Sequence, residues 1–99
     1  MSSCQTTNQA DEDIIEIYIR GVQDFGVSAA ELYLEKLRTT FELLADFPKM
    51  SRLWKEFRPP LRAHPCGSNM IFYSEVQNGV LILRVLGGSQ DWQRHFDFE

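Results

Sequence analysis

The chain has 99 residues, of which 43% are hydrophobic and 24% are charged, a composition typical of one ordinary globular domain. No run of about 18 apolar residues occurs, which excludes a membrane-spanning helix. The polar N-terminus is unlike an export signal, so we expect a cytoplasmic protein. The net charge of −4 disfavours loose binding to phosphates, and we expect no direct sequence-specific nucleic-acid binding.

The residues that most often bind metals are sparse. Cys4 and Cys66 are the only cysteines, and without CxxC spacing or an export signal they are expected to be reduced. Two histidines and no Cys/His cluster argue against zinc. The acidic run at 11–13 is explained by the preference of helix starts for negative charge. We therefore expect no metal and no cofactor.

The first half of the chain predicts a weak strand and two helices. Residues 2–7 are compatible with an edge strand. Asn8 is the predicted N-cap of a helix with apolar residues at helical spacing, and Gly26 ends this helix. Ser28 and Glu31 form a capping box for a second helix, which ends before the next proline. The connection between the two helices, roughly residues 26–27, is so short that the helices must fold back as a hairpin.

The second half changes to strand patterns. Strands are predicted at 61–64, 70–76 and 80–86, with an Asn-Gly pair marking the last hairpin. Ser89 is the predicted cap of a short final helix through about Phe96. The order β-α-α-β-β-β-α indicates an α+β fold in one domain, residues 1–99, with a helical hairpin on one face of a small, mainly antiparallel sheet. We expect the other face to be partly open.

Arg84 is the one charge in an otherwise apolar strand. Simple alternation places it on the same side as Ile82 and opposite Leu83. We expect this side to be the open face, where Arg84 would lie with Arg62 and Tyr73. There it could hold a carboxylate or phosphate of a partner, or it could be a structural arginine paired within the chain.

Catalytic patterns are weak. His64 and His95 could act as bases near neutral pH, but a structural histidine is the favoured interpretation of His64, and no aspartate is placed to orient His95. No GxSxG motif occurs, and the Gly87–Gly88 pair lacks the rest of a phosphate-binding loop. The sequence therefore favours a protein that is not an enzyme.

Two aromatic pairs have alternative interpretations. Trp54 and Phe57 lie among basic residues, a pattern that can bind single-stranded nucleic acid. We favour the alternative that they pack their loop onto the second helix. Trp92 and Phe96, four residues apart, either cap the core or present an apolar ridge, and the sequence leaves both open.

Longer segments suggest a family. The second half, PPLRAHPCGSNMIFYSEVQNGVLILRVLGGSQDWQRHF, has an Arg ahead of a G-S-x-x-x-F-Y strand, an Asn-Gly hairpin, and an I-x-R-V-L strand before a short C-terminal segment. The first half contains ADEDIIEIYIRGVQDFG and AAELYLEKLRTTFELLADFPKM. In this order and spacing the motifs resemble the ParE toxins of the RelE/ParE superfamily, over nearly the whole chain.

The resemblance implies the toxin of a bacterial type II toxin–antitoxin pair. ParE toxins inhibit DNA gyrase, whereas RelE toxins cleave mRNA on the ribosome, and in both branches the antitoxin lays a helical and extended tail across the toxin. We favour the ParE branch, because this chain is acidic and no dense basic cluster follows its last strand. The expected protein is a non-enzymatic gyrase inhibitor held by a ParD-like antitoxin in a hetero-oligomer.

Two other functions stay open. A RelE-like, ribosome-dependent mRNA endonuclease would use Arg62, Arg84 and His95. A non-toxic antitoxin-binding module is the third possibility. Many ParE-like sequences read R-V-L-H at the end of the last strand, and here Gly87 replaces the histidine, which removes a group that could transfer a proton.

The resemblance also suggests which residues meet each partner. The residues expected to bind the target are Arg62, Tyr73, Arg84, Trp92, His95 and Phe96. Those expected to bind the antitoxin are Ile15, Tyr18, Val22, Leu34, Arg38, Arg58 and Ile82.

Overall fold

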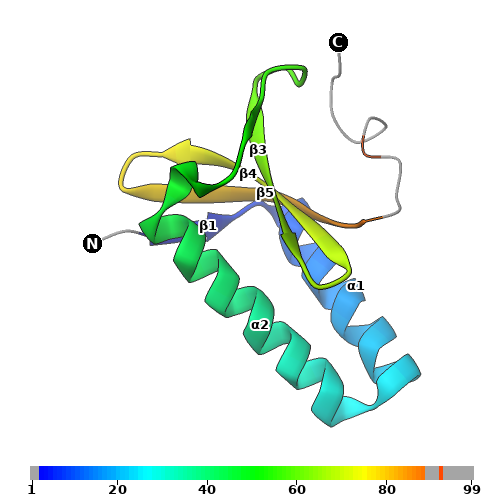
Figure 1. Cartoon of the computed structure of the whole chain (residues 1–99). Coiled ribbons are helices and arrows are strands. Elements are labelled where there is room, and N and C mark those ends of the chain that lie inside the picture. Colours follow the sequence, from blue (N-terminus) through cyan, green and yellow to red (C-terminus); the bar gives the residue numbers. More distant parts are fainter. Residues whose placement is uncertain (1–2, 89–91, 93–99) are drawn as a thin grey trace.

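The computed structural model describes residues 3–88 and Trp92 (Figure 1). Two helices form a hairpin that lies against one side of a five-stranded sheet. The elements in chain order are β1 (Ser3–Thr6), α1 (Asn8–Phe25), α2 (Val27–Asp46), the short 3-10 helix η1 (Pro48–Met50), β2 (Leu53–Trp54), β3 (Leu61–Cys66), β4 (Asn69–Val76) and β5 (Gly79–Gly87). The predicted α+β fold is confirmed, and the predicted final helix lies outside the described residues apart from Trp92.

The helices begin one or two residues away from the predicted caps. Thr7, and not Asn8, is the N-cap of α1, and its Oγ1 accepts a hydrogen bond from the Ala10 amide at 3.0 Å. Gly26, with φ of 91°, ends α1 and is also the N-cap of α2. The capping box predicted at Ser28 is wrong, because Gly26 already supplies the carbonyl that accepts from the Ala30 amide and no side chain caps α2.

The sheet has the order β1-β5-β4-β3-β2. β1 pairs with β5 in parallel, and the other neighbours are antiparallel. β2, a strand of two residues, was not predicted. The pairing of β4 with β5 shifts by one residue, so that Phe72 faces Arg84 whereas Tyr73 faces Ile82. The extra residue on β5 is Leu83, and such a bulge interrupts the alternation of side chains along the strand.

Apolar side chains pack on both faces of the sheet. The larger cluster lies between the helical hairpin and the sheet and includes Leu37 and Leu44 of α2 with Ile71 and Val80 of the sheet. The second cluster contains five buried residues, which are Phe57, Leu61, Ala63, Phe72 and Leu86. The expectation of a partly open second face is therefore wrong for its centre, because the chain after β2 covers it.

The aromatic residues of this second cluster make edge-on contacts. The Trp54 ring lies 6.1 Å from Phe57 and 6.2 Å from Trp92, and Trp92 lies 5.3 Å from Phe72. Trp54 and Phe57 thus pack onto the sheet, and not onto the second helix as predicted. Of the two alternatives for Trp92, the structure shows the core contact.

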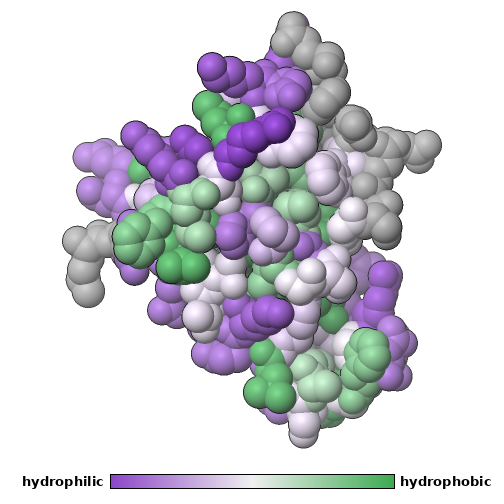
Figure 2. Space-filling view, in the orientation of Figure 1, coloured by the Kyte–Doolittle hydropathy of each residue, from purple (hydrophilic) through white to green (hydrophobic). Residues whose placement is uncertain are grey.

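Exposed apolar side chains lie at both ends of α2. Phe25 and Val27 are exposed at the tip of the hairpin, and Leu43, Phe47 and Met50 are exposed near η1. Figure 2 shows apolar surface in separate areas over these two ends. Within residues 3–88, no helix is both long and apolar enough to cross a bilayer.

Candidate functional site

Arg84 is neutralised by Asp13 of α1. The Arg84 Nε lies 2.8 Å from Asp13 Oδ2 and its Nη2 lies 2.9 Å from Oδ1, so the pair is bidentate. The two side chains are only 17% and 11% exposed. The carboxylate raises the pKa of Arg84 above its ordinary value by accepting these hydrogen bonds, which is the arrangement expected of a structural arginine.

The local sequence explains why Asp13 is placed there. β1 ends at Thr6, opposite Ile82, so beyond this point α1 lies beside the edge of β5. Thr7 Oγ1 donates to the Leu83 carbonyl at 2.8 Å. Asp13 Oδ2 accepts from the Val85 amide at 2.9 Å. The start of α1 therefore takes over hydrogen bonds that a longer β1 would have made.

Arg62 and Tyr73 do not share a face with Arg84. Arg62 faces Tyr73 across β3 and β4, whereas Arg84 faces Phe72. Neighbouring residues of a strand point to opposite faces, so the predicted polar centre on one exposed face is not formed. Tyr73 is fully buried, its hydroxyl donates to the Pro48 carbonyl at 2.8 Å, and burial raises its pKa.

Arg62 belongs to a polar cluster that holds the segment around η1. Its Nε and Nη2 lie 3.0 and 2.9 Å from Glu75 Oε1, and its Nη1 donates to the Ser51 carbonyl at 2.6 Å. His64 Nδ1 lies 2.7 Å from Ser51 Oγ, and burial lowers the pKa of His64. These contacts tie the chain after α2 to β3 and β4.

The three residues considered for RNA cleavage are therefore not assembled in the described part of the chain. Arg62 and Arg84 start from opposite faces of the sheet, and His95 lies outside the described residues. Within residues 3–88 and Trp92, no three His, Cys, Asp or Glu side chains are grouped so that they could hold a metal ion.

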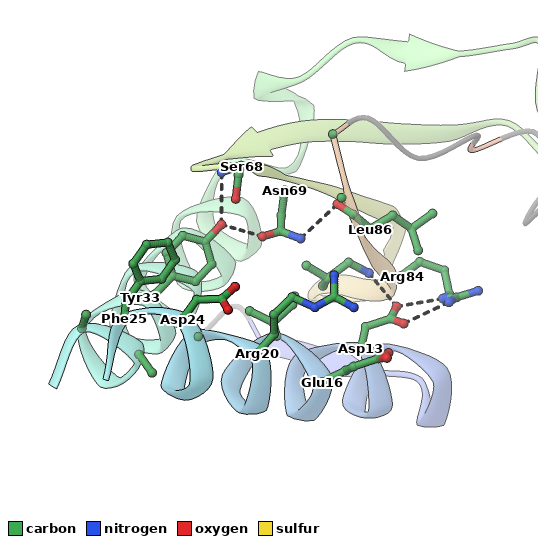
Figure 3. A pocket seen from close by; sticks show the side chains of 17 residues that line it. Asp13, Glu16, Arg20, Asp24, Phe25, Tyr33, Ser68, Asn69, Arg84 and Leu86 are labelled. Atoms are coloured by element: carbon green, nitrogen blue, oxygen red, sulfur yellow. Dashed lines mark hydrogen bonds and ion pairs between the residues drawn. The ribbon is translucent and has the colours of Figure 1, made fainter. Parts of the chain in front are cut away.

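A cavity of about 780 Å³ lies between the helical hairpin and the end of β5. Figure 3 shows Asp13, Glu16, Arg20 and Asp24 along α1 on one side of it. On the other side, the Tyr33 hydroxyl of α2 lies 2.6 Å from Asn69 Oδ1. The wall near β5 ends in two glycines, Gly87 and Gly88.

Sequence reasoning missed Asp13 and Arg20 as site residues. Asp13 was attributed to the helix dipole, and nothing in the sequence showed that it would face Arg84. Arg20 lies seven residues after Asp13, which places both on one face of α1, and this spacing was the available signal.

The residues expected to bind an antitoxin differ in their exposure to solvent. Ile15 is 58% exposed, and Arg38 is exposed and paired with Glu35 at 2.9 Å. Ile82 is fully buried in the helix-side cluster, so its expected contact with a partner is wrong. The remaining residues are half-buried Tyr18, Val22 and Leu34 and exposed Arg58.

The residues expected to bind a target are also spread out. Trp92 is half-buried against the second cluster. His95 and Phe96 lie outside the described residues. Tyr73, being buried, lies on no surface.

Comparison with known proteins identifies the family. The family model for the ParE toxin of the type II toxin–antitoxin system parDE matches residues 5–92. A ParE1 toxin of Caulobacter vibrioides is 30% identical over 95 residues, which cover 96% of this chain and 98% of the relative. A ParE1 toxin of Mycobacterium tuberculosis is 33% identical over 72 residues, covering 72% and 74% of the two chains.

The fold agrees with a solved structure. A chain of the chromosomal ParDE toxin–antitoxin system from P. aeruginosa superposes with a TM-score of 0.74 at 18% identity, covering 88% of this chain and 96% of that chain. The match to the ParE model over most of the sequence, together with the full-length relative, shows that this chain belongs to the ParE toxin family of type II toxin–antitoxin systems.

Proposed function

We propose that this chain inhibits DNA gyrase in the cytoplasm without catalysing a reaction, and that a ParD-like antitoxin neutralises it in a hetero-oligomer. Membership of the ParE family supports the proposal. The observation that carries its non-enzymatic part is the bidentate pair between Arg84 and Asp13.

An RNA-cleaving site needs positive charge at the scissile phosphate. Here Asp13 cancels the charge of Arg84, and Glu75 cancels that of Arg62. Gly87 stands where many ParE-like chains have a histidine. These features favour a toxin that acts by binding over a RelE-like endonuclease.

We propose separate surfaces for the antitoxin and for the target. The antitoxin would contact the hairpin around Ile15, with Tyr18, Val22, Leu34, Arg38 and Arg58. The target would contact the C-terminal end of the chain, at Trp92, His95 and Phe96. Arg62 and Arg84 would support the target surface through their ion pairs.

Expression of the chain in bacterial cells separates the three candidate functions. A gyrase inhibitor stops growth and relaxes a reporter plasmid, whereas a RelE-like enzyme stops growth and cuts mRNA at codon boundaries. A non-toxic module leaves growth unchanged. We expect plasmid relaxation with intact mRNA, and co-expression of a cognate ParD-like antitoxin should restore growth. Cleaved mRNA with normal supercoiling would contradict the proposal.

A further inference from the structure

The outer edge of β1 has backbone groups without a strand partner. β1 is the last strand of the sheet on the β5 side (Figure 1). The amides of Ser3 and Thr7 donate to carbonyls in and just before β5, at 2.7 and 3.0 Å. Because the backbone groups of a strand point alternately to its two sides, the N–H and C=O groups of Cys4 and Thr6 point away from β5. No other strand of the described chain lies beside them.

This edge lacks most of the features that keep strand edges from pairing, which are lysines, prolines and bulges. β1 has the sequence SCQT, with no charge and no proline, and it pairs with β5 in an unbroken register. The opposite edge strand, β2, has only two residues, and Pro59 and Pro60 follow shortly after it. β1 is therefore the edge to which a short further strand can be added, opposite Cys4 and Thr6.

The surroundings of this edge are acidic. Asp11 Oδ1 accepts a hydrogen bond from the Thr6 hydroxyl at 2.5 Å. Glu42 of α2 lies near Cys4, since burial and, to a lesser extent, this carboxylate raise the pKa of the Cys4 thiol. Neither carboxylate forms an ion pair with a described residue, and Arg38, one turn before Glu42, is already paired within α2. The unmatched charge beside β1 is therefore negative, and it favours an added strand that carries a lysine or arginine.

The edge continues the surface proposed above for the antitoxin. Leu34, Arg38 and Glu42 follow one another at intervals of four residues, so they lie in one row along α2. Leu34 and Cys4 pack against the same helix-side cluster, and α2 packs against β1. A partner that covers Leu34 and Arg38 and continues along this row therefore reaches the outer edge of β1.

We infer that an extended segment of the antitoxin adds a strand to the outer edge of β1 and carries a lysine or arginine that binds Glu42. The inference rests on the proposed function, because it specifies how the antitoxin is held. Main-chain hydrogen bonds with Cys4 and Thr6 contribute affinity that does not depend on the antitoxin's side chains, and the basic residue contributes specificity.

Hydrogen exchange of backbone amides, followed by NMR, tests the added strand. In the free chain the Cys4 and Thr6 amides should exchange quickly, whereas the Gln5 amide, which points to β5, should be protected. Saturation with the cognate ParD-like antitoxin should slow exchange at Cys4 and Thr6 by about tenfold or more. Unchanged exchange at both positions in the complex would overturn the inference and leave the proposed function intact. Protection in the free chain that is lost on dilution would assign the edge to a second copy and would also overturn it.

Two variants at one position test the same hydrogen bonds by affinity. Thr6→Pro and Thr6→Val both remove the hydroxyl that bonds Asp11, but only Thr6→Pro also removes the outward N–H. Thr6→Pro should therefore bind the antitoxin about tenfold more weakly than Thr6→Val. Thermal unfolding of each variant checks that it is folded. Equal affinities of the two folded variants would contradict the added strand.

Charge variants test the basic residue. Glu42→Lys should weaken binding about tenfold or more, and Glu42→Gln should weaken it less. Glu16→Lys is the matched control, because Glu16 is an exposed carboxylate that lines the cavity beside β5, and it should bind as the wild type does. Equal affinity of the wild type and Glu42→Lys would overturn the pairing with Glu42. A wild-type chain that does not bind this antitoxin would overturn both the inference and the proposed function.

Discussion

Asp13 binds two groups that lie more than 70 positions away in the sequence. It accepts two hydrogen bonds from the Arg84 guanidinium and one from the Val85 amide. Because both side chains are largely buried, the removal of either charge breaks an ion pair in a poorly solvated place. This residue therefore fixes the position of α1 along the edge of β5.

Asp13→Asn should destabilise the fold by about 2–4 kcal/mol, because it removes the bidentate ion pair with Arg84 and weakens the hydrogen bonds that residue 13 accepts. The free energy of unfolding from urea titration measures this. Glu35→Gln is the control, since it breaks the exposed pair with Arg38 and should cost less than about 0.5 kcal/mol. Equal losses for the two variants would show that the buried pair has no special role.

The stability should depend on the protonation of His64. Its pKa is lowered by burial, so at mildly acidic pH the unfolded chain binds a proton that the folded chain does not. Neutral His64 makes its full contribution to the free energy of unfolding above the ordinary histidine pKa of about 6.5. That contribution is lost as the pH falls below this value and through the lowered pKa of the folded state.

Urea titrations between about pH 7.5 and 5 measure this dependence. The wild type should lose more stability over this range than His64→Gln, in which that group is absent. His95 is present in both proteins and so cancels in the comparison. Identical pH profiles would contradict the lowered pKa of His64.

The sequence indicated two roles for Arg84, binding a group of a partner or pairing within the chain, but it did not distinguish between them. The choice depends on Asp13, whose proximity is a result of tertiary folding. The sheet face predicted for Arg84 was wrong, because β5 has one extra residue, Leu83, in its pairing with β4. Simple alternation cannot reveal a bulge, since the bulge depends on the partner strand.

At the scale of elements, the patterns of apolar residues were reliable. Both helices and the strands β3, β4 and β5 appear where periodicity predicted them, because each must bury one apolar face. β2 could not be predicted, since two residues carry no periodic signal. The caps were less predictable, because several residues near each helix start can accept the same amide hydrogen bonds.

The caps of the two helices give a matched pair of variants. Thr7→Ala should destabilise the protein by about 1–2 kcal/mol, because Thr7 Oγ1 both caps α1 and bonds the Leu83 carbonyl. Ser28→Ala should change stability by less than about 0.5 kcal/mol, because no side chain caps α2. Thermal unfolding curves measure both. A loss of stability well above about 0.5 kcal/mol for Ser28→Ala would support the capping box that the sequence suggested.

At the scale of the whole molecule, the sheet is covered on both sides. The helical hairpin covers one face, and Phe57 and Trp92 pack against the other. The sequence predicted only the first layer, because a loop that folds back over a sheet has no periodic pattern. Function was therefore sought on a sheet face, whereas the described cavity lies between α1, α2 and β5.

This arrangement leaves binding as the activity that the molecule supports best. The ion pairs of Arg62 and Arg84 hold the sheet to η1 and α1. Most of the exposed large apolar residues lie on the helices and at their ends. An acidic chain with Arg62 and Arg84 engaged internally is better suited to hold a protein surface than to cleave RNA.

The most direct test adds the purified chain to purified DNA gyrase in a supercoiling assay. We predict that micromolar protein prevents the supercoiling of relaxed plasmid, and that prior addition of a cognate antitoxin restores it. Heat-denatured chain at the same concentration is the control. Undiminished supercoiling at micromolar folded protein would contradict the proposed inhibition of gyrase.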